Sequence, residues 1–184
     1  VTIGYRLETG ELALIWTTTP WTVPSNIAMA VHPEIDYVVV ESEFSGTTER
    51  YIIAEARLPY YTRELGEDAA DRIVERFKGT ELVGRRYTPP FNYFIGHPKG
   101  HVVLPADYVT TEDGTGLVHQ SPAFGADDLA VSRAYGLPVL NPIGADGHFG
   151  PDAGLIAGQF FKDADEPLVN DLRARGLLFR HVPY

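Results

Sequence analysis

Two stretches of the chain carry groups that could do chemistry. The first motif, residues 16–26, holds three consecutive threonines, residues 17–19, after an apolar run. The second motif, residues 114–128, contains His119 and ends on Asp128. Hydroxyls, an imidazole and a carboxylate that converge on one pocket can bind a polar substrate and orient its reaction. We therefore predict that the two motifs form the walls of one pocket.

The three threonines can line one pocket only if the strand that leads into them ends there. Residues 12–16 are apolar and rich in aromatic and branched side chains, which favours a buried strand. Side chains alternate across a strand, so Thr17 and Thr19 would share one face and Thr18 the other. Pro20 has no N–H for a ladder and restricts the residue before it to extended conformations. We expect the strand to end before Pro20.

Each of these groups also has a purely structural explanation. Threonine favours strands, where its hydroxyl can bond to neighbouring backbone. An isolated His119 is more often a hydrogen-bonded core histidine, and Asp128 or Asp127 would suit the first turn of a helix. A catalytic triad of Thr18, His119 and Asp128 is formally possible, but the spacing of these residues in the sequence is no evidence for it. The residues by themselves predict a pocket and leave its reaction open.

Metal and nucleotide sites find no support. The absence of cysteine excludes disulfides and thiolate ligands and is compatible with a reducing compartment. His97 and His101 are four residues apart, but Pro98 and Gly100 argue against the helix that would align them, so we expect no metal site. No phosphate-binding glycine loop occurs, and the fragment at residues 95–97 is too short to indicate an adenylate-binding motif.

Serine hydrolase chemistry is not supported either. Ser25, Ser121 and Ser132 are present, and none of them lies in a G-x-S-x-G context. A nucleophilic serine on a strained turn is therefore not expected.

The charge balance argues against a generic nucleic-acid binder. The 184 residues include 15 Lys and Arg against 25 Asp and Glu, a formal net charge of −10. A surface that grips a phosphate backbone needs clustered positive charge. The basic groups at residues 72–78 and 84–86 are short enough to be solvated faces. If the partner is a nucleic acid, another part of the protein must provide most of the binding contacts.

Composition indicates one soluble domain, residues 1–184, with 44% hydrophobic residues. The chain begins at Val1 without an initiator Met or a signal-peptide pattern, so we expect an excised piece of a larger protein. No apolar run approaches the roughly 20 residues of a membrane helix.

Patterning predicts an α+β fold: a β-rich, barrel-like mixed sheet core with a few short peripheral helices. Strands are expected at residues 1–7, 12–16, 27–31, 37–41, 51–54 and 101–104. Helices are expected from Asp68 to Gly79, over residues 126–135, and from about 163 to Gly176 with Pro167 in the first turn. Residues 87–100 are expected to form a loop.

At the two motifs the chain resembles the editing domain, or connective peptide 1, of class I isoleucyl-tRNA synthetases. Both motifs are long and match in order, and the similarity spans essentially the whole chain. Valyl- and leucyl-type relatives carry an Arg-Pro pair where this chain has residues 19–21, which favours the isoleucyl type. Val23 and Ser121 stand where Leu and Ala are frequent. The ATP-binding motifs of the synthetase are absent, so this piece is not expected to charge tRNA.

The resemblance implies hydrolysis of valine from mischarged tRNA(Ile), with isoleucine refused by size. Asp128 would hold the α-ammonium group, and His119 would form part of the excluding wall. The threonines and Asn26 would position the ester and the attacking water. The implied catalytic residues are Thr17, Thr18, Thr19, Asn26 and Asp128. The implied substrate-binding residues are Trp16, Trp21, His119, Phe124, Gly125 and Asp128.

The resemblance also implies the setting of this reaction. The partners would be the 3′ end of tRNA(Ile) and the remainder of the synthetase, with no cofactor or metal in this domain and no membrane. The protein would be monomeric and cytoplasmic. Two alternatives stay open: a non-catalytic tRNA-docking insertion, and a threonine-nucleophile hydrolase of small esters. Whether valyl-adenylate is also a substrate stays open too.

Overall fold

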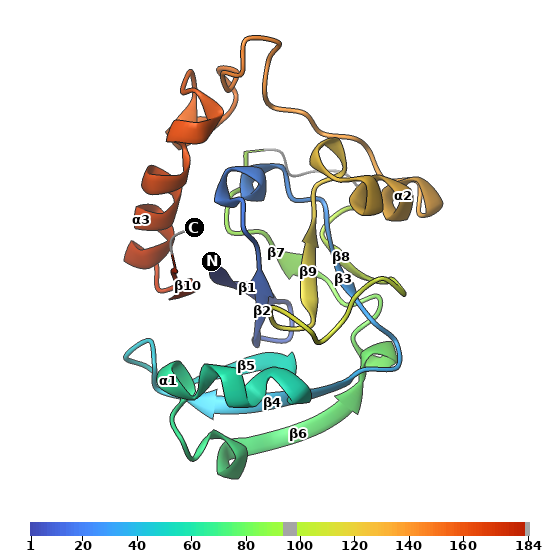
Figure 1. Ribbon diagram of the computed structural model, residues 1–184, viewed down its shortest axis with the longest axis vertical. Coiled ribbons are helices and arrows are strands. Elements are labelled where there is room, and N and C mark those ends of the chain that lie inside the picture. Colours follow the sequence, from blue (N-terminus) through green and yellow to red (C-terminus); the bar gives the residue numbers. More distant parts are fainter. Residues whose placement is uncertain (94–98, 183–184) are drawn as a thin grey trace.

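A computed structural model of the chain describes residues 1–93 and 99–182. Its strands are β1 (Thr2–Leu7), β2 (Leu12–Trp16), β3 (Ala28–Val31), β4 (Asp36–Ser42), β5 (Glu49–Ala54), β6 (Ile73–Lys78), β7 (Tyr87–Thr88), β8 (Val102–Pro105), β9 (Leu117–Gln120) and β10 (Leu178–Arg180). They form two mixed sheets (Figure 1). The large sheet has the order β10-β1-β2-β5-β4-β6, with β7 paired to β1, and the small sheet has the order β8-β3-β9.

The helices are short and lie outside the sheets (Figure 1). They are α1 (Thr62–Leu65), α2 (Ala126–Ala134) and α3 (Asp165–Ala174). The turns of 3₁₀ helix are Pro20–Ser25, Glu55–Tyr61, Ala69–Arg72, Gly79–Glu81, Pro122–Phe124, Gly154–Ile156 and Phe161–Asp163. The predictions of α2 and α3 are confirmed, including Pro167 in the first turn of α3. None of the helices in the described part of the chain has the length and apolar character of a membrane span.

The central strands of the large sheet are buried on both faces. The main core lies between the two sheets and joins residues such as Ile15 of β2 to Met29 of β3 and Leu117 of β9. A second core covers the opposite face, where Leu14 packs with Leu58. Strands that are buried on both faces read as continuous apolar runs instead of alternating ones. This explains why residues 12–16 predict a buried strand, which β2 confirms.

The prediction of a barrel-like core is wrong. In the described part of the chain the ladders end at β10 and β6 in the large sheet and at β8 and β9 in the small one, so both sheets are open. The physical reason is that β9 pairs with β3 and does not continue the ladder of β2. Among the described residues the two sheets meet through side chains, through scattered hydrogen bonds, and through an isolated antiparallel bridge between Arg86 and Val102 that does not extend into a ladder.

The predicted helix from Asp68 to Gly79 is also wrong. Residues 69–72 form a 3₁₀ turn, and β6 follows as an edge strand paired antiparallel with β4. The apolar spacing of this segment fits a helix, but Val74 is 47% exposed, and the pairing of β6 with β4 outweighs the local pattern. The charged side chains of β6 point outwards, as is common on edge strands.

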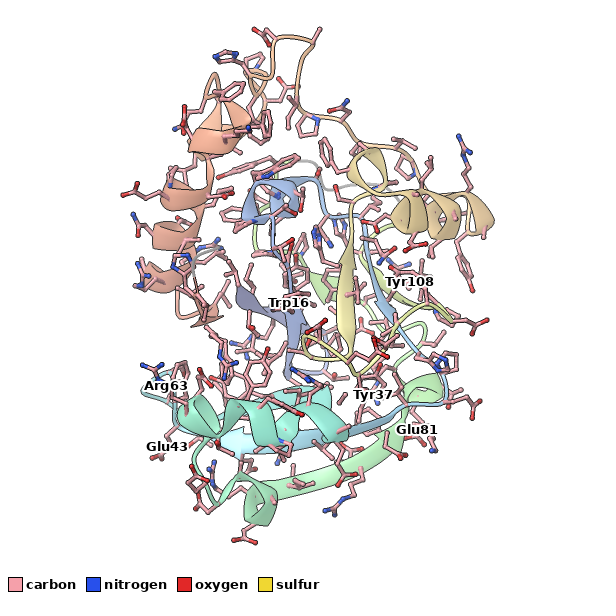
Figure 2. All side chains as sticks on the ribbon, viewed as in Figure 1. Trp16, Tyr37, Glu43, Arg63, Glu81 and Tyr108 are labelled. Carbon is pink, nitrogen blue, oxygen red and sulfur yellow. The ribbon has the colours of Figure 1, made fainter. Side chains whose placement is uncertain are left out.

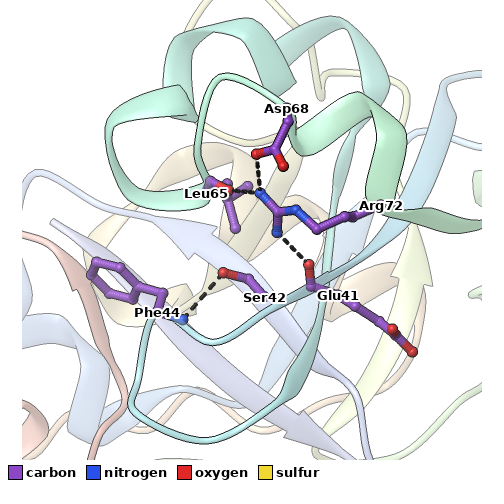
Figure 3. A network of polar contacts seen from close by, with 6 residues as sticks. All are labelled: Glu41, Ser42, Phe44, Leu65, Asp68 and Arg72. Carbon is purple, nitrogen blue, oxygen red and sulfur yellow. Dashed lines mark hydrogen bonds and ion pairs between the residues drawn. The ribbon is translucent and has the colours of Figure 1, made fainter.

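Arg72 holds the turn before β6 against the large sheet (Figure 3). Its guanidinium donates to the carbonyl oxygen of Glu41 at 2.6 Å, to the carbonyl of Leu65, and to the Asp68 carboxylate at 3.0 Å. These bonds tie the turn to β4 through Glu41 and to α1 through Leu65.

Three short strands, β7, β9 and β10, were not among the predicted elements. Each has two to four residues, too few for a periodic pattern, and β9 lies inside the glycine-rich second motif. The strand expected at residues 101–104 is shifted by one residue, as β8. Part of the loop predicted for residues 87–100 lies outside the described residues.

Tyr37 joins the two sheets. This buried residue of β4 donates its hydroxyl to the carbonyl oxygen of Gly116, just before β9, at 2.5 Å. The oxygen of the Tyr37 hydroxyl also accepts the backbone N–H of His32, which follows β3, at 3.2 Å. One side chain of the large sheet therefore satisfies two backbone groups of the segments that flank the small sheet.

We expect Tyr37→Phe to lower the free energy of unfolding by about 1–3 kcal/mol, because it leaves a half-buried N–H and a buried carbonyl without their partner. Urea denaturation measures this change. Tyr60→Phe is the matched control, since Tyr60 is 61% exposed and should lose less than about 0.5 kcal/mol. Equal losses in the two variants would contradict the role of Tyr37.

Candidate active site

The two motifs meet at a pocket of about 310 Å³, between the end of β2 in the large sheet and β9 in the small one. This volume lies at the lower end of the range for small-molecule sites. Trp16 and Tyr108 border it on either side of β9 (Figure 2). The predicted site residues that line it are Trp16, Thr17, Thr18, Thr19, His119, Phe124 and Asp128.

The strand that carries the threonines ends at Trp16, as predicted, and the 3₁₀ turn begins at Pro20. Thr17 is buried, and its hydroxyl oxygen accepts the backbone N–H of Thr19 at 3.1 Å. Thr18 is exposed, and its hydroxyl has no hydrogen-bond partner among residues 1–93 and 99–182. Thr18 therefore offers the pocket a hydroxyl that the fold does not use.

His119 is buried behind the first motif. Its Nε2 lies 2.9 Å from the Thr22 hydroxyl, and its Nδ1 lies 3.3 Å from the side-chain nitrogen of Asn26. Burial lowers the pKa of His119 to about 4, so its ring is neutral at pH 7. His119 lines the pocket while protein groups contact both of its ring nitrogens.

Asp128 lies in the first turn of α2, where Gly125 precedes it. Its Oδ2 accepts the backbone N–H of Ser121 at 2.8 Å. Burial raises the pKa of Asp128, and the bond from Ser121 and the nearby Asp127 act in opposite directions on it. A Cβ on residue 125 would lie 3.0 Å from the carboxylate, so glycine gives this side chain room to fold back towards β9.

Three predicted site residues do not line the pocket. Trp21 packs edge-on against Phe124 and Phe161, with ring centroids 4.9 and 4.8 Å apart. Gly125 only makes room for Asp128, and Asn26 is buried behind His119. Their predicted direct roles at the substrate stay predictions. The structure places them where they support residues that do reach the pocket.

Further polar residues line the pocket that the predictions did not include: Thr22, Tyr108, Thr110, Asp113, Thr115 and Ser121. Thr22, Thr115 and Ser121 lie inside the two motifs, so their positions were the available signal. Tyr108, Thr110 and Asp113 precede the second motif, and no local pattern predicts that this segment approaches β2.

The pocket carries negative charge. Its lining includes the carboxylates of Asp113 and Asp128 and, among the described residues, no Lys or Arg. With His119 neutral, a cationic group is the favoured ligand for the part of the pocket near Asp128. In the described part of the chain no three acidic or histidine side chains come close enough together to hold a metal ion. His97 lies outside the described residues.

Comparison with known proteins identifies the family, although no protein-family model matches the chain. The isoleucine–tRNA ligase of Streptomyces coelicolor is 52% identical over 189 residues, which cover all of this chain and 17% of that protein. The enzyme of Mycobacterium tuberculosis is 40% identical over 200 residues, all of this chain and 19% of that protein. The chain belongs to the isoleucine–tRNA ligase family. The resemblance predicted from the two motifs is confirmed.

The chain spans less than a fifth of these ligases. Two solved structures share the fold of this segment. The crystal structure of GlLeuRS-CP1 superposes with a TM-score of 0.68 at 16% identity, covering 92% of this ligase segment and 80% of that chain. The editing domain of the Plasmodium falciparum cytosolic leucyl-tRNA synthetase gives 0.64 at 13% identity, covering 92% and 79%. At these identities the likeness concerns the fold of the segment.

The lowered pKa of His119 makes the stability of this ligase segment depend on pH. In the unfolded chain the histidine takes up a proton as pH falls through about 6.5, whereas the folded chain resists until about 4. Its contribution is therefore complete above pH 6.5 and declines below it, by up to about 1.4 kcal/mol per pH unit. Urea unfolding at pH 7.5 and pH 5 measures the decline.

His119→Gln should reduce this decline, because it removes the group that titrates. The matched control is His148→Gln, which makes the same substitution at an exposed histidine that does not line the pocket. An unchanged slope in His119→Gln would show that His119 is not held neutral by the fold.

Proposed function

We propose that this chain hydrolyses the ester of valine on mischarged tRNA(Ile) and refuses isoleucine by size. The observation that carries the proposal is that three groups line one pocket. They are the Thr18 hydroxyl, which has no hydrogen-bond partner in the described part of the chain, the neutral ring of His119 and the carboxylate of Asp128. Membership of the isoleucine–tRNA ligase family and the fold of synthetase editing domains support it. We also propose that this chain acts as part of a whole isoleucine–tRNA ligase.

The charge of the pocket supports an aminoacyl ester as substrate. Such an ester carries a positive α-ammonium group next to the carbonyl that is to be attacked. Asp128 would bind this group through a charge-assisted hydrogen bond, and no Lys or Arg among the described lining residues competes for the carboxylate. Binding a cation would also favour the ionised form of Asp128 against the burial that raises its pKa.

Water is the proposed nucleophile. Its oxygen forms a bond to the ester carbonyl carbon, the bond from that carbon to the ribose oxygen breaks, and the ribose oxygen takes up a proton. The products are valine and tRNA with a free terminal hydroxyl. An aminoacyl ester is activated enough that orientation of water can suffice. In this proposal the Thr18 hydroxyl orients this water, and the turn formed by Thr17 and Thr19 presents that hydroxyl to the pocket.

The ring of His119 suits a steric role better than proton transfer. Both of its nitrogens contact protein groups, and its pKa of about 4 leaves it neutral. Valine lacks one methylene of isoleucine, which is worth only about 0.8 kcal/mol of burial, so attraction alone discriminates weakly. A rigid wall that collides with the extra methylene discriminates more strongly.

Because the chain has a net charge of −10, we propose that other parts of the ligase bind the phosphate backbone of the tRNA body. In this proposal the segment receives only the 3′ end, works as a monomer in the cytoplasm together with the rest of the synthetase, and needs no cofactor of its own. Valyl-adenylate is a second candidate substrate for the same pocket.

We expect the chain at high concentration to deacylate valyl-tRNA(Ile) and to leave isoleucyl-tRNA(Ile) intact. Asp128→Ala should lower kcat/KM for the valyl ester by about 10- to 100-fold, the value of one hydrogen bond to a charged group. Asp127→Ala is the matched control, since this neighbouring carboxylate is exposed and does not line the pocket. Release of radiolabelled valine measures the rate.

The same assay separates the alternatives. A docking insertion would bind tRNA equally well with or without Asp128 and would cleave neither ester, also within the full-length ligase. A threonine-nucleophile hydrolase would cleave small esters without an amino group at the same rate in Asp128→Ala, and rapid quenching would trap an acyl-enzyme on Thr18. Either pattern would contradict the proposal.

We expect His119→Ala to admit isoleucine, because it removes the ring that forms the wall. Hydrolysis of isoleucyl-tRNA(Ile) should rise at least about tenfold relative to the valyl ester, in line with the usual energetic value of a steric methylene. The two deacylation rates measured side by side test this. An unchanged ratio would assign size exclusion to another part of the lining.

A further inference from the structure

Behind the pocket wall, buried polar groups form one continuous chain of hydrogen bonds. The Tyr87 hydroxyl donates to the side-chain oxygen of Asn26. The side-chain nitrogen of Asn26 donates to the carbonyl oxygen of Ala28 at 2.9 Å and lies 3.3 Å from Nδ1 of His119. Nε2 of His119 lies 2.9 Å from the hydroxyl of Thr22. The four residues that contribute side chains to this network are at most 7% exposed, so water does not replace these contacts easily.

The partners at the two ends give the chain a direction. The carbonyl of Ala28 can only accept, so the nitrogen of the Asn26 amide faces it and the oxygen faces Tyr87. The second N–H of that amide then points at Nδ1 of His119, which must be the unprotonated ring nitrogen. The ring proton is therefore on Nε2, where it meets Thr22.

The Thr22 hydroxyl completes the sequence. Its oxygen accepts the proton of His119, and its own proton goes to the carbonyl oxygen of Thr19 at 2.8 Å. Every donor from Tyr87 to Thr22 thus meets an acceptor. A fully satisfied buried network favours one arrangement of its members.

We propose that Tyr87 is a positioning residue for the specificity wall: its hydroxyl orients the Asn26 amide and thereby holds His119 as the Nε2–H tautomer with its ring carbons towards the pocket. Tyr87 lies outside both motifs and does not line the pocket. The consequence for specificity rests on the proposed function, whereas the consequence for the tautomer does not.

The large sheet gives Tyr87 a firm position. β7 pairs with β1 through the register of Tyr87 with Leu7. The Tyr87 ring packs against Tyr5, with centroids 5.5 Å apart, and edge-on against His101 at 5.8 Å. His101 is held in the left-handed region of φ at 56°, which few residues other than glycine adopt. Tyr87 therefore links the large sheet, through Asn26, to His119 of the small sheet.

Tyr87→Phe removes the hydroxyl and keeps the packed ring. The oxygen of Asn26 would then be buried without a donor, and its amide could turn to find another partner. His119 would lose the N–H that marks Nδ1 as the acceptor, so its ring could hold the proton on either nitrogen. The His119 ring would stay at the pocket, but it would no longer be held in one tautomer and one orientation.

Nitrogen-15 NMR of histidine-labelled protein at pH 7.5 reads this directly, without substrate. The wild type should show His119 with Nε2 protonated and Nδ1 bare. Tyr87→Phe should show a mixture, with the preference reduced about fivefold, the factor of one neutral hydrogen bond. Tyr5→Phe is the matched control: it removes a buried hydroxyl from the adjacent ring, and that hydroxyl has no partner in the described part of the chain.

A second measurement tests specificity. The ratio of valyl- to isoleucyl-tRNA(Ile) deacylation should fall about fivefold in Tyr87→Phe and stay at the wild-type value in Tyr5→Phe. An unchanged tautomer in Tyr87→Phe, or equal changes in both variants, would overturn the role of Tyr87. If the wild type cleaves neither ester while the tautomer still shifts, the proposed function fails and the positioning of His119 by Tyr87 stands.

Discussion

The structure depends on how the segment before β9 is bonded to the large sheet. The hydroxyl of Thr115 donates to the carbonyl of Leu14 in β2 at 2.5 Å, and the carbonyl of Thr115 accepts the N–H of Ala54 at the end of β5 at 2.9 Å. Gly116 follows with a φ of 82°, and a Cβ there would lie 2.6 Å from the Cβ of Ala54. The sheets can approach this closely only because residue 116 is glycine.

This junction decides where a pocket can exist. Thr115 and Gly116 line the pocket, which lies between the end of β2 and β9. A closed barrel would have filled this space with side chains. The first motif leaves β2 through Pro20 and the second motif leaves β9 towards α2, and both supply polar groups to the gap.

The polar groups of the site divide into those that are bonded to the protein and those that are not. His119 is fully occupied by the buried network and stays neutral, which suits a wall. Thr18 has no hydrogen-bond partner in the described part of the chain, and Asp128 accepts one backbone N–H and retains further lone pairs. Rigid groups that exclude and unengaged groups that bind are the two requirements of a site that selects a substrate by size and charge.

The sequence alone determined the features that follow from local chemistry: the end of β2 before Pro20, the helices α2 and α3, and the association of the two motifs through their resemblance to a known family. The tertiary structure decided the rest. Residues 73–78 form a strand because β4 offers them backbone partners, and Asn26 lies behind His119 because β3 pairs with β9. Local patterns report which face of a segment is apolar, whereas strand pairing joins residues far apart along the chain. That is why the open sheets and the network at Tyr87 emerged only from the fold.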